Sequence, residues 1–183
     1  DPKLACGIIC ASGTLGQIIP PSTVLIFMGD ILQGANAQAQ MAIGNFMIDV
    51  GGEVRAQGRN ARGQPWRIAV ERPVDAEPEP YAIVQLDNAA VTTSGEYRHY
   101  YDRDGRRYSH TIDPRTGRPV AHSLASVVVI GPTSMHTDAW ATAFNVLGTQ
   151  EGHALAIQLE MPVLFVDEAG ESLRSVTTPQ FEP

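Results

Sequence analysis

Two stretches of different pattern follow one another along the chain. Residues 4–29 contain no charged side chain, and an apolar run of this length is long enough to cross the hydrocarbon core of a bilayer as one helix. Pro20 and Pro21 interrupt the run, and Gly13 and Gly16 weaken the turn before them. The pattern therefore predicts two apolar halves around a break, a form that is tolerated at membrane depth only where other protein covers the backbone.

From residue 47 onward the pattern becomes that of an α+β protein. In PWRIAVERP, residues 65–73, the side chains of Trp66, Ile68 and Val70 occupy alternate positions, which is typical of a half-buried strand. LASVVVIGP, residues 124–132, is apolar throughout and predicts a central strand buried on both faces. Further strands are expected at residues 47–50, 81–86, 89–95 and 162–167, and a hairpin at 96–112 that turns at Asp104–Gly105.

Helices are expected only late in the chain. Thr133 or Ser134 can serve as the N-cap of a helix whose apolar residues recur at helical spacing as far as Leu147, and Gly148 is a typical stop. Residues 149–160 predict a second helix. The expected fold is therefore α+β, with a mixed or antiparallel sheet core and late helices, preceded by the apolar broken-helix segment.

Composition and charge limit the number of domains and the kinds of partner that the chain is expected to have. The chain has 183 residues, which suits one domain or one domain with an appendage. Its net charge is −7, and its 13 Lys and Arg residues are scattered, so no nucleic-acid partner is predicted. Of the charged residues, residues 1–46 contain only Asp1, Lys3 and Asp30, which supports a division of the chain near residue 46. Cys6 and Cys10 would share one face of a helix and indicate no redox compartment.

A carboxylate and a hydroxyl are spaced for cation binding on the first late helix. Asp138 and Thr142 are four residues apart, so they lie on one helix face, one turn from each other. Two hard oxygen ligands suit Mg²⁺ or Ca²⁺ rather than zinc. The alternative interpretation is an Asp near the helix start, favoured by the helix dipole, followed by an ordinary surface Thr.

The stretch SHTIDPRTG, residues 109–117, forms a corner after a strand. His110 at the strand end is able to accept a proton from an incoming hydroxyl. The alternative is a plain β-turn, because Asp113 before Pro114 and glycine at 117 are good turn residues.

Two other strands end on small residues. Gly51–Gly52 and Ser94–Gly95 would let a ligand approach the backbone closely, although ordinary turns explain them equally well.

The first segment resembles a known membrane protein. SGTLGQIIPPS and the residues around it, within residues 1–46, are similar to part of the large membrane subunit of TRAP-type dicarboxylate transporters, where this stretch belongs to a broken membrane helix. This resemblance implies membrane association through residues 4–29.

The remainder resembles a different family. MIDVGGEVRAQGRN, SHTIDPRTG and TDAWATA occur in the order seen in FAD:protein FMN transferases of the ApbE type, and the likeness extends over residues 47–183. It implies the C-terminal part of a flavin transferase domain. The metal ligands of the family include the residues matched by Asp138 and Thr142, and its candidate base is matched by His110. The flavin nucleotide would lie near Gly51, Gly52, Ser94, Gly95, Thr111 and Ile112.

The activity that this resemblance implies is Mg²⁺-dependent transfer of FMN from FAD to a threonine hydroxyl of an acceptor flavoprotein, with release of AMP. Because the likeness covers only the C-terminal part of the family, we expect impaired activity. The alternatives are a Mg²⁺-dependent FAD binder or pyrophosphatase and, from the first segment, a non-catalytic fragment of a transporter subunit. The expected location is the inner membrane or its periplasmic face.

Overall fold

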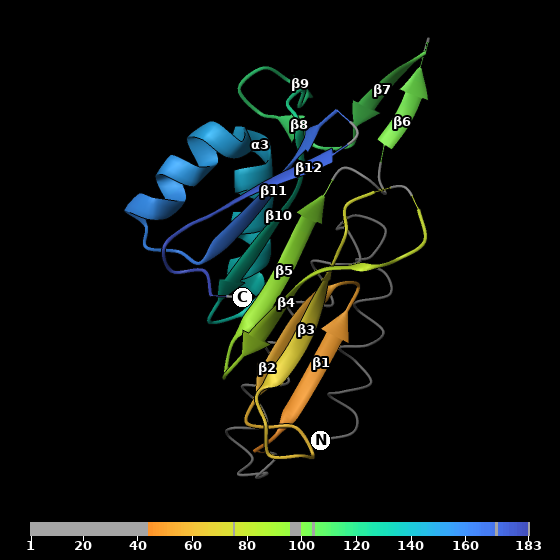
Figure 1. Cartoon of the computed structure of the whole chain (residues 1–183). Helices are drawn as coiled ribbons and strands as arrows, with labels where there is room; N and C mark the ends of the chain where they lie inside the picture. The colour runs from red at the N-terminus through yellow and green to blue at the C-terminus, as the bar shows by residue number, and fades with distance from the viewer. Residues whose placement is uncertain (1–43, 75, 96–99, 104, 171, 183) are drawn as a thin grey trace, which may run out of the picture.

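The computed structural model describes residues 44–74, 76–95, 100–103, 105–170 and 172–182 (Figure 1). Its centre is a six-stranded sheet in which every strand pairs antiparallel with its neighbours. In spatial order the strands are β1 (Phe46–Val50), β2 (Glu53–Gln57), β5 (Ala90–Gly95), β10 (Leu124–Gly131), β11 (Val163–Ala169) and β12 (Ser172–Thr177).

The other elements lie on or beside this sheet. The helix α3 (Ser134–Gln158) packs against β5 and β10. Three two-stranded units complete the described fold: β3 (Trp66–Glu71) with β4 (Pro80–Leu86), β6 (Tyr100–Arg103) with β7 (Arg106–Ser109), and β8 (Ile112–Asp113) with β9 (Arg118–Pro119). The predicted α+β class is confirmed, and the described sheet pairs are antiparallel rather than mixed.

The strand β10 is buried on both faces, as its apolar run predicted. Val127 and Val129 pack in one apolar cluster with Phe144 of α3, while Val128 packs in another with Val84 of β4. This division follows from the strand geometry, because successive side chains point to opposite faces. The sheet therefore lies between two covers, helix α3 on one face and the β3–β4 hairpin on the other.

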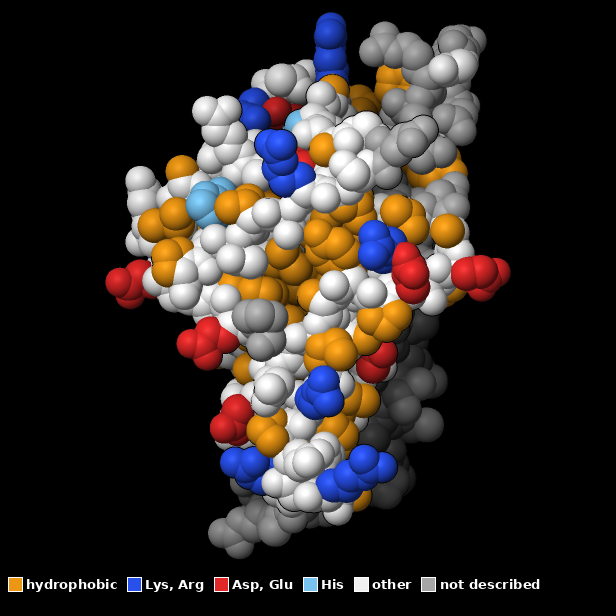
Figure 2. Space-filling view, in the orientation of Figure 1, with side chains coloured by type: hydrophobic (Ala, Val, Ile, Leu, Met, Phe, Trp, Pro, Cys, Tyr) orange, Lys and Arg blue, Asp and Glu red, His pale blue; other side chains and the backbone are white. Residues whose placement is uncertain are grey.

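The β3–β4 hairpin shows the predicted alternation. Val70 is buried, Trp66 and Ile68 are half-buried against the same cluster, and Arg67 and Ala69 are exposed. In Figure 2, hydrophobic side chains are gathered in the middle of the face where β5 and this hairpin lie, while Lys, Arg, Asp and Glu are scattered around it.

The strands β2 and β12 were not predicted. In β2 only Val54 and Ala56 point inward, between half-buried polar side chains, so its alternation is short and weak. The strand β12 is an edge strand that is mostly exposed, and its sequence resembles a loop. Each pairs across a tight turn with the strand before it in sequence, β2 with β1 and β12 with β11, so hairpin pairing rather than a strong alternation makes these segments strands.

The two predicted late helices form one kinked helix. Thr133 is the N-cap, and its hydroxyl accepts a hydrogen bond from the His136 amide at 3.2 Å. Gly148 departs from helical geometry with φ 75° and ψ 174°, after which the second segment continues to Gln158. Gly148 thus ends the first segment as predicted, and the chain then resumes a helix in a new direction.

The predicted apolar broken helix falls on residues 1–43, which lie outside the described residues. Phe46, the last residue of the predicted transporter-like segment, is the first residue of β1. Among the residues that the structure describes, no helix combines the length and apolar character that crossing a bilayer requires.

The conformation of Gly148 predicts that a side chain at this position destabilises the fold. A Cβ built at residue 148 would lie 2.9 Å from Cδ2 of His122. The backbone there also has a positive φ, which residues other than glycine rarely adopt. We expect Gly148→Ala to lower the free energy of unfolding by about 2–3 kcal/mol, measured by urea denaturation.

Gly63→Ala is the matched control, because residue 63 also has a positive φ of 72° but no atom lies within 4 Å of an added Cβ. It should lose only about 1 kcal/mol. Equal losses in the two variants would show that contact with His122 has no part in the effect.

Candidate functional site

The turn between β1 and β2 consists of Gly51 and Gly52. Their φ angles are 66° and 101°, which glycine adopts without strain, and the Gly52 amide donates a hydrogen bond to Oδ1 of Asp49 at 3.1 Å. The two glycines therefore close a tight hairpin rather than simply ending a strand.

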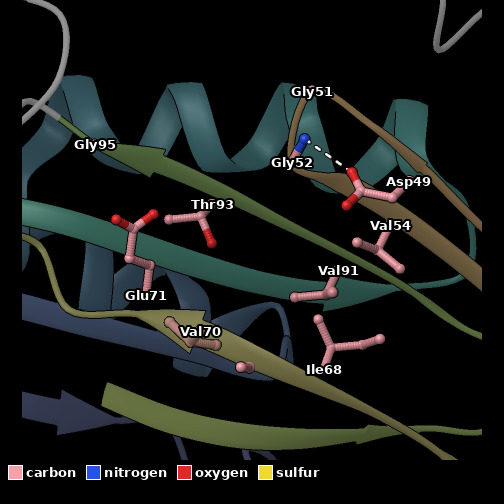
Figure 3. A pocket seen from close by; sticks show the side chains of 11 residues that line it. Asp49, Gly51, Gly52, Val54, Ile68, Val70, Glu71, Val91, Thr93 and Gly95 are labelled. Carbon is pink, nitrogen blue, oxygen red and sulfur yellow. Dashed lines mark hydrogen bonds between the residues drawn. The ribbon is translucent and has the colours of Figure 1, made fainter. Parts of the chain in front are cut away.

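A cavity of about 510 Å³ opens beside this turn (Figure 3). The apolar side chains of Val54, Ile68 and Val91 point toward one another within it, and Glu71 and Thr93 lie together at another part of its wall. Its lining residues are Asp49, Gly51, Gly52, Val54, Ile68, Ala69, Val70, Glu71, Val91, Thr93 and Gly95. Three of the predicted cofactor-binding residues, Gly51, Gly52 and Gly95, thus share one cavity.

Glu53, directly after the turn, was not predicted as a site residue. Its Oε2 is buried and has no hydrogen-bond partner. Burial raises the pKa of Glu53 to about 7, an increase that its own backbone amide partly offsets and that the carboxylates of Asp138 and Asp49 enhance. A charged residue immediately after a glycine turn was the signal that the sequence offered.

Asp138 lies in the second turn of α3 and is half-buried. Burial raises the pKa of its carboxyl group. It is the fifth residue of the helix, near the helix start but beyond the first turn, which contains no acidic residue. The alternative explanation by the helix dipole loses its basis, since that effect is confined to the first turn. Thr142 follows one turn later and is exposed.

The corner around Asp113 is a self-contained turn. The Gly117 amide donates to the Asp113 carbonyl at 2.8 Å, and the Arg115 amide donates to Asp113 Oδ1 at 2.9 Å. The Arg115 side chain also binds this carboxylate and holds the pKa of Asp113 below its usual range. The turn interpretation is therefore correct for Asp113. His110 and Ile112 are both exposed on this corner.

Asn145 joins this corner to the helix and to the sheet. Its Nδ2 donates to Ser94 Oγ on β5 and to Thr111 Oγ1 in the corner, each at 3.3 Å. Its backbone carbonyl accepts a hydrogen bond from His122 Nε2 at 2.7 Å. The sequence patterns identified neither Asn145 nor His122 as a site residue. The only available signal was a polar side chain next to Phe144 within the apolar face of the helix.

A second contact joins α3 to β5 nearer the helix start. Thr92 Oγ1 and Thr137 Oγ1 are both buried and lie 2.7 Å apart. Asp138 and Thr142 stand on the helix between this contact and Asn145. The structure thus brings Ser94 and Thr111 to the segment of α3 that contains Asp138 and Thr142. Ile112 and His110 do not line the cavity beside Gly51 and Gly52.

The described residues include no group of three or more His, Cys, Asp or Glu side chains arranged to hold a metal ion. The donor set available from Asp138 and Thr142 is therefore small and consists of oxygen only. Such a set suits an ion that retains water or substrate oxygens in its shell, as Mg²⁺ does.

The chain is similar to proteins of one known family. The model of the ApbE family matches residues 32–165. The chain is 42% identical over 148 residues to the FAD:protein FMN transferase of Salmonella typhimurium and 39% identical over 148 residues to that of Escherichia coli strain K12. Each alignment covers 81% of this chain and 42% of the relative.

Solved structures give the same result. The flavin transferase ApbE from Vibrio cholerae superposes with a TM-score of 0.73 at 36% identity, covering 88% of this chain and 49% of that one. The apo form of the Pseudomonas stutzeri flavinyl transferase ApbE gives 0.70 at 35% identity, covering 87% and 48%. The chain thus spans less than half the length of these relatives.

The family match begins at residue 32, inside the segment predicted to resemble a transporter. These flavin transferases give no support to the transporter resemblance. The division of the chain at residue 46 stays a prediction.

The buried carboxyl of Glu53 predicts a pH dependence of stability. Between pH 4.5, its ordinary pKa, and about 7, the folded chain retains a proton that the unfolded chain has released. Raising the pH through this window therefore favours unfolding. In buffer containing EDTA, Glu53→Gln should remove this decline and be more stable than the parent at pH 8 by about 1–2 kcal/mol, a figure that allows for solvent screening.

The measurement is urea denaturation at several pH values from 4.5 to 8. Glu168→Gln, which neutralises an exposed carboxyl on β11, is the control and should keep the pH slope of the parent. A Glu53→Gln variant with the parental slope would contradict the assignment.

Proposed function

This chain belongs to the ApbE family, and on that premise we propose that it transfers FMN from FAD to a threonine hydroxyl of an acceptor flavoprotein. The supporting observation is the contact at Asn145, which joins the His110 corner to the helix segment that contains Asp138 and Thr142. His110, which can accept a proton, and the proposed cation ligands Asp138 and Thr142 are thereby attached to the same helix.

Asp138 and Thr142 are the residues that would hold Mg²⁺. The fit rests on their hard oxygen donors and on the neighbouring Glu53, whose buried Oε2 has no partner and whose carboxyl lies in the field of Asp138. Two half-buried carboxyl groups that repel each other are stabilised either by a proton or by a cation. When bound, Mg²⁺ neutralises the charge of a pyrophosphate.

His110 would act on the acceptor. Its exposure at the end of β7 leaves it accessible to a protein substrate, and an imidazole can remove the proton from an attacking threonine hydroxyl at neutral pH. The threonine oxygen forms a bond to the phosphorus of the FMN moiety, the bond from that phosphorus to the AMP oxygen breaks, and AMP leaves.

The flavin nucleotide would lie along the ends of the strands. Gly51, Gly52 and Gly95 line the cavity and expose the backbone there, and Ser94, Thr111 and Ile112 extend from β5 to the corner. The glycines matter because a side chain at these positions would occupy space that a ligand needs.

The function is tested with FAD, Mg²⁺ and a flavoprotein carrying a target threonine. We expect flavin fluorescence attached to the acceptor in a denaturing gel, together with AMP. Release of FMN and AMP without labelling would instead indicate FAD hydrolysis. No affinity for FAD by fluorescence titration would reject both activities.

Asp138→Ala should lower the rate of transfer at least about 100-fold and remove its dependence on Mg²⁺. The fold should persist, because burial disfavours the charged carboxyl of Asp138 and its removal relieves that cost. Asp87→Ala, at an exposed position before β5, is the matched control and should respond to Mg²⁺ like the parent. The same response to Mg²⁺ in Asp138→Ala would contradict the ligand assignment.

His110→Ala should reduce kcat by about 10²- to 10⁴-fold while the Kd for FAD stays within about threefold of the parent. Rapid-quench measurement of transfer and fluorescence titration of FAD separate the two effects. If FAD binding is lost along with transfer, His110 is a binding contact rather than the base.

The location of the protein is proposed from resemblance alone: the inner membrane or its periplasmic face, with residues 4–29 as the segment that associates with the bilayer. Washing membranes with carbonate tests this proposal, since a chain that is released into the supernatant is not inserted.

A further inference from the structure

Asn145 is a fully buried polar side chain that no part of the proposed reaction uses. It belongs to the first segment of α3, three residues after Thr142 and seven after Asp138. A primary amide has two N–H donors, so it can bind two acceptors at the same time. Its acceptors among the described residues include the hydroxyls of Ser94 and Thr111, on segments that are 51 and 34 residues away in sequence.

Thr111 is already fixed within the corner by its backbone. Its amide donates to Ser109 Oγ at 2.8 Å, and its carbonyl accepts from the Val120 amide at 3.0 Å. Its side chain is therefore the group by which the corner contacts Asn145. Since His110 immediately precedes Thr111, this contact also determines where His110 stands relative to the helix.

The carbonyl of Asn145 makes a separate contact. It lies in the last turn before the kink at Gly148, where helix carbonyls lack partners further along the same helix, and it accepts from His122. His122 follows β9 and leads into β10, so the corner and the chain that leaves it are attached to the same helical residue.

Another link between the corner and the helix is weaker. Arg115 binds Glu151 in the second segment of α3 at 3.2 Å, but both side chains are more than half exposed. Exposed ion pairs contribute little, because solvent screens them and ordering the side chains costs entropy. The hydrogen bonds of Asn145, whose side chain is fully buried, are the stronger link.

We propose that Asn145 is a positioning residue: by donating to Ser94 and Thr111 it holds the His110 corner at a fixed place relative to Asp138 and Thr142 on the same helix segment. Its catalytic consequence rests on the proposed function, whereas the structural link is measurable without activity. Loss of the amide should loosen the corner and misplace His110 without removing any group that binds the cation or the nucleotide.

The test uses Asn145→Leu, which keeps a similar volume but has no donor, and Thr111→Val, which removes the acceptor on the corner and keeps the shape. Hydrogen exchange is measured on the full chain without ligands. In both variants we expect faster exchange of peptides covering residues 109–120, while peptides from β10 keep the protection of the parent. The comparison with β10 separates local loosening of the corner from global destabilisation.

Transfer kinetics supply the second readout. Asn145→Leu should lower kcat by about 10- to 100-fold, with the Mg²⁺ affinity within about threefold of the parent. In hydrogen exchange, the double variant with Thr111→Val should loosen residues 109–120 little more than Asn145→Leu alone, because both changes break one interaction. Glu151→Gln, which weakens only the exposed link, should keep the parental rate and exchange.

Each outcome decides the proposal. Unchanged exchange at residues 109–120 in Asn145→Leu overturns it, as does an unchanged kcat in an active parent. A loss shared by kcat, the Mg²⁺ affinity and the protection of β10 shows a merely structural role and also overturns it. If the parent itself transfers no FMN, the proposed function fails, while selective loosening of the corner in both variants still supports the link through Asn145.

Discussion

The structure depends on a strand that must be buried on both faces. Val127 and Val129 of β10 lie in one apolar cluster and Val128 in the other, so neither face of the strand is stable in water. One cover alone would leave the other set of valines exposed. The fold therefore requires both helix α3 and the β3–β4 hairpin, and the position of the helix over β5 and β10 is a consequence of this requirement.

Once α3 lies over β5, polar groups determine its position along that strand. Apolar packing is largely non-directional, whereas hydrogen bonds need specific partners. Thr137 meets Thr92, and Asn145 meets Ser94 two positions further along β5. A shifted helix would leave these groups buried without partners, which costs more than a net hydrogen bond gains. Asp138 and Thr142 lie between these two contacts, so the same constraint places the candidate ligands.

Sequence pattern predicted the elements that are determined by residues close together in sequence. The alternation around Ile68, the apolar run of β10, the N-cap at Thr133 and the stop at Gly148 each reflect a local cause. The candidate pair Asp138 and Thr142 followed from helical spacing in the same way. Asn145 could not be predicted, because its partners are distant in sequence and a polar residue in an apolar face does not reveal what it binds. Glu53 likewise depends on burial that only the assembled sheet produces.

The kink at Gly148 explains why one helix can serve both the core and the corner. A straight continuation would place the second segment along the direction of the first. The change in direction instead lets Gly152 approach the ring of Phe165, where an added Cβ would lie 3.0 Å from Cε1, and lets Thr149 donate to Asp167 of β11. The same departure ends the first segment, so the carbonyl of Asn145 becomes available to His122. Glycine is required at residue 148 for both effects, because the positive φ permits the turn and the missing side chain admits the imidazole ring. A single backbone conformation thus attaches the helix to β11 on one side and to the chain that leaves the corner on the other.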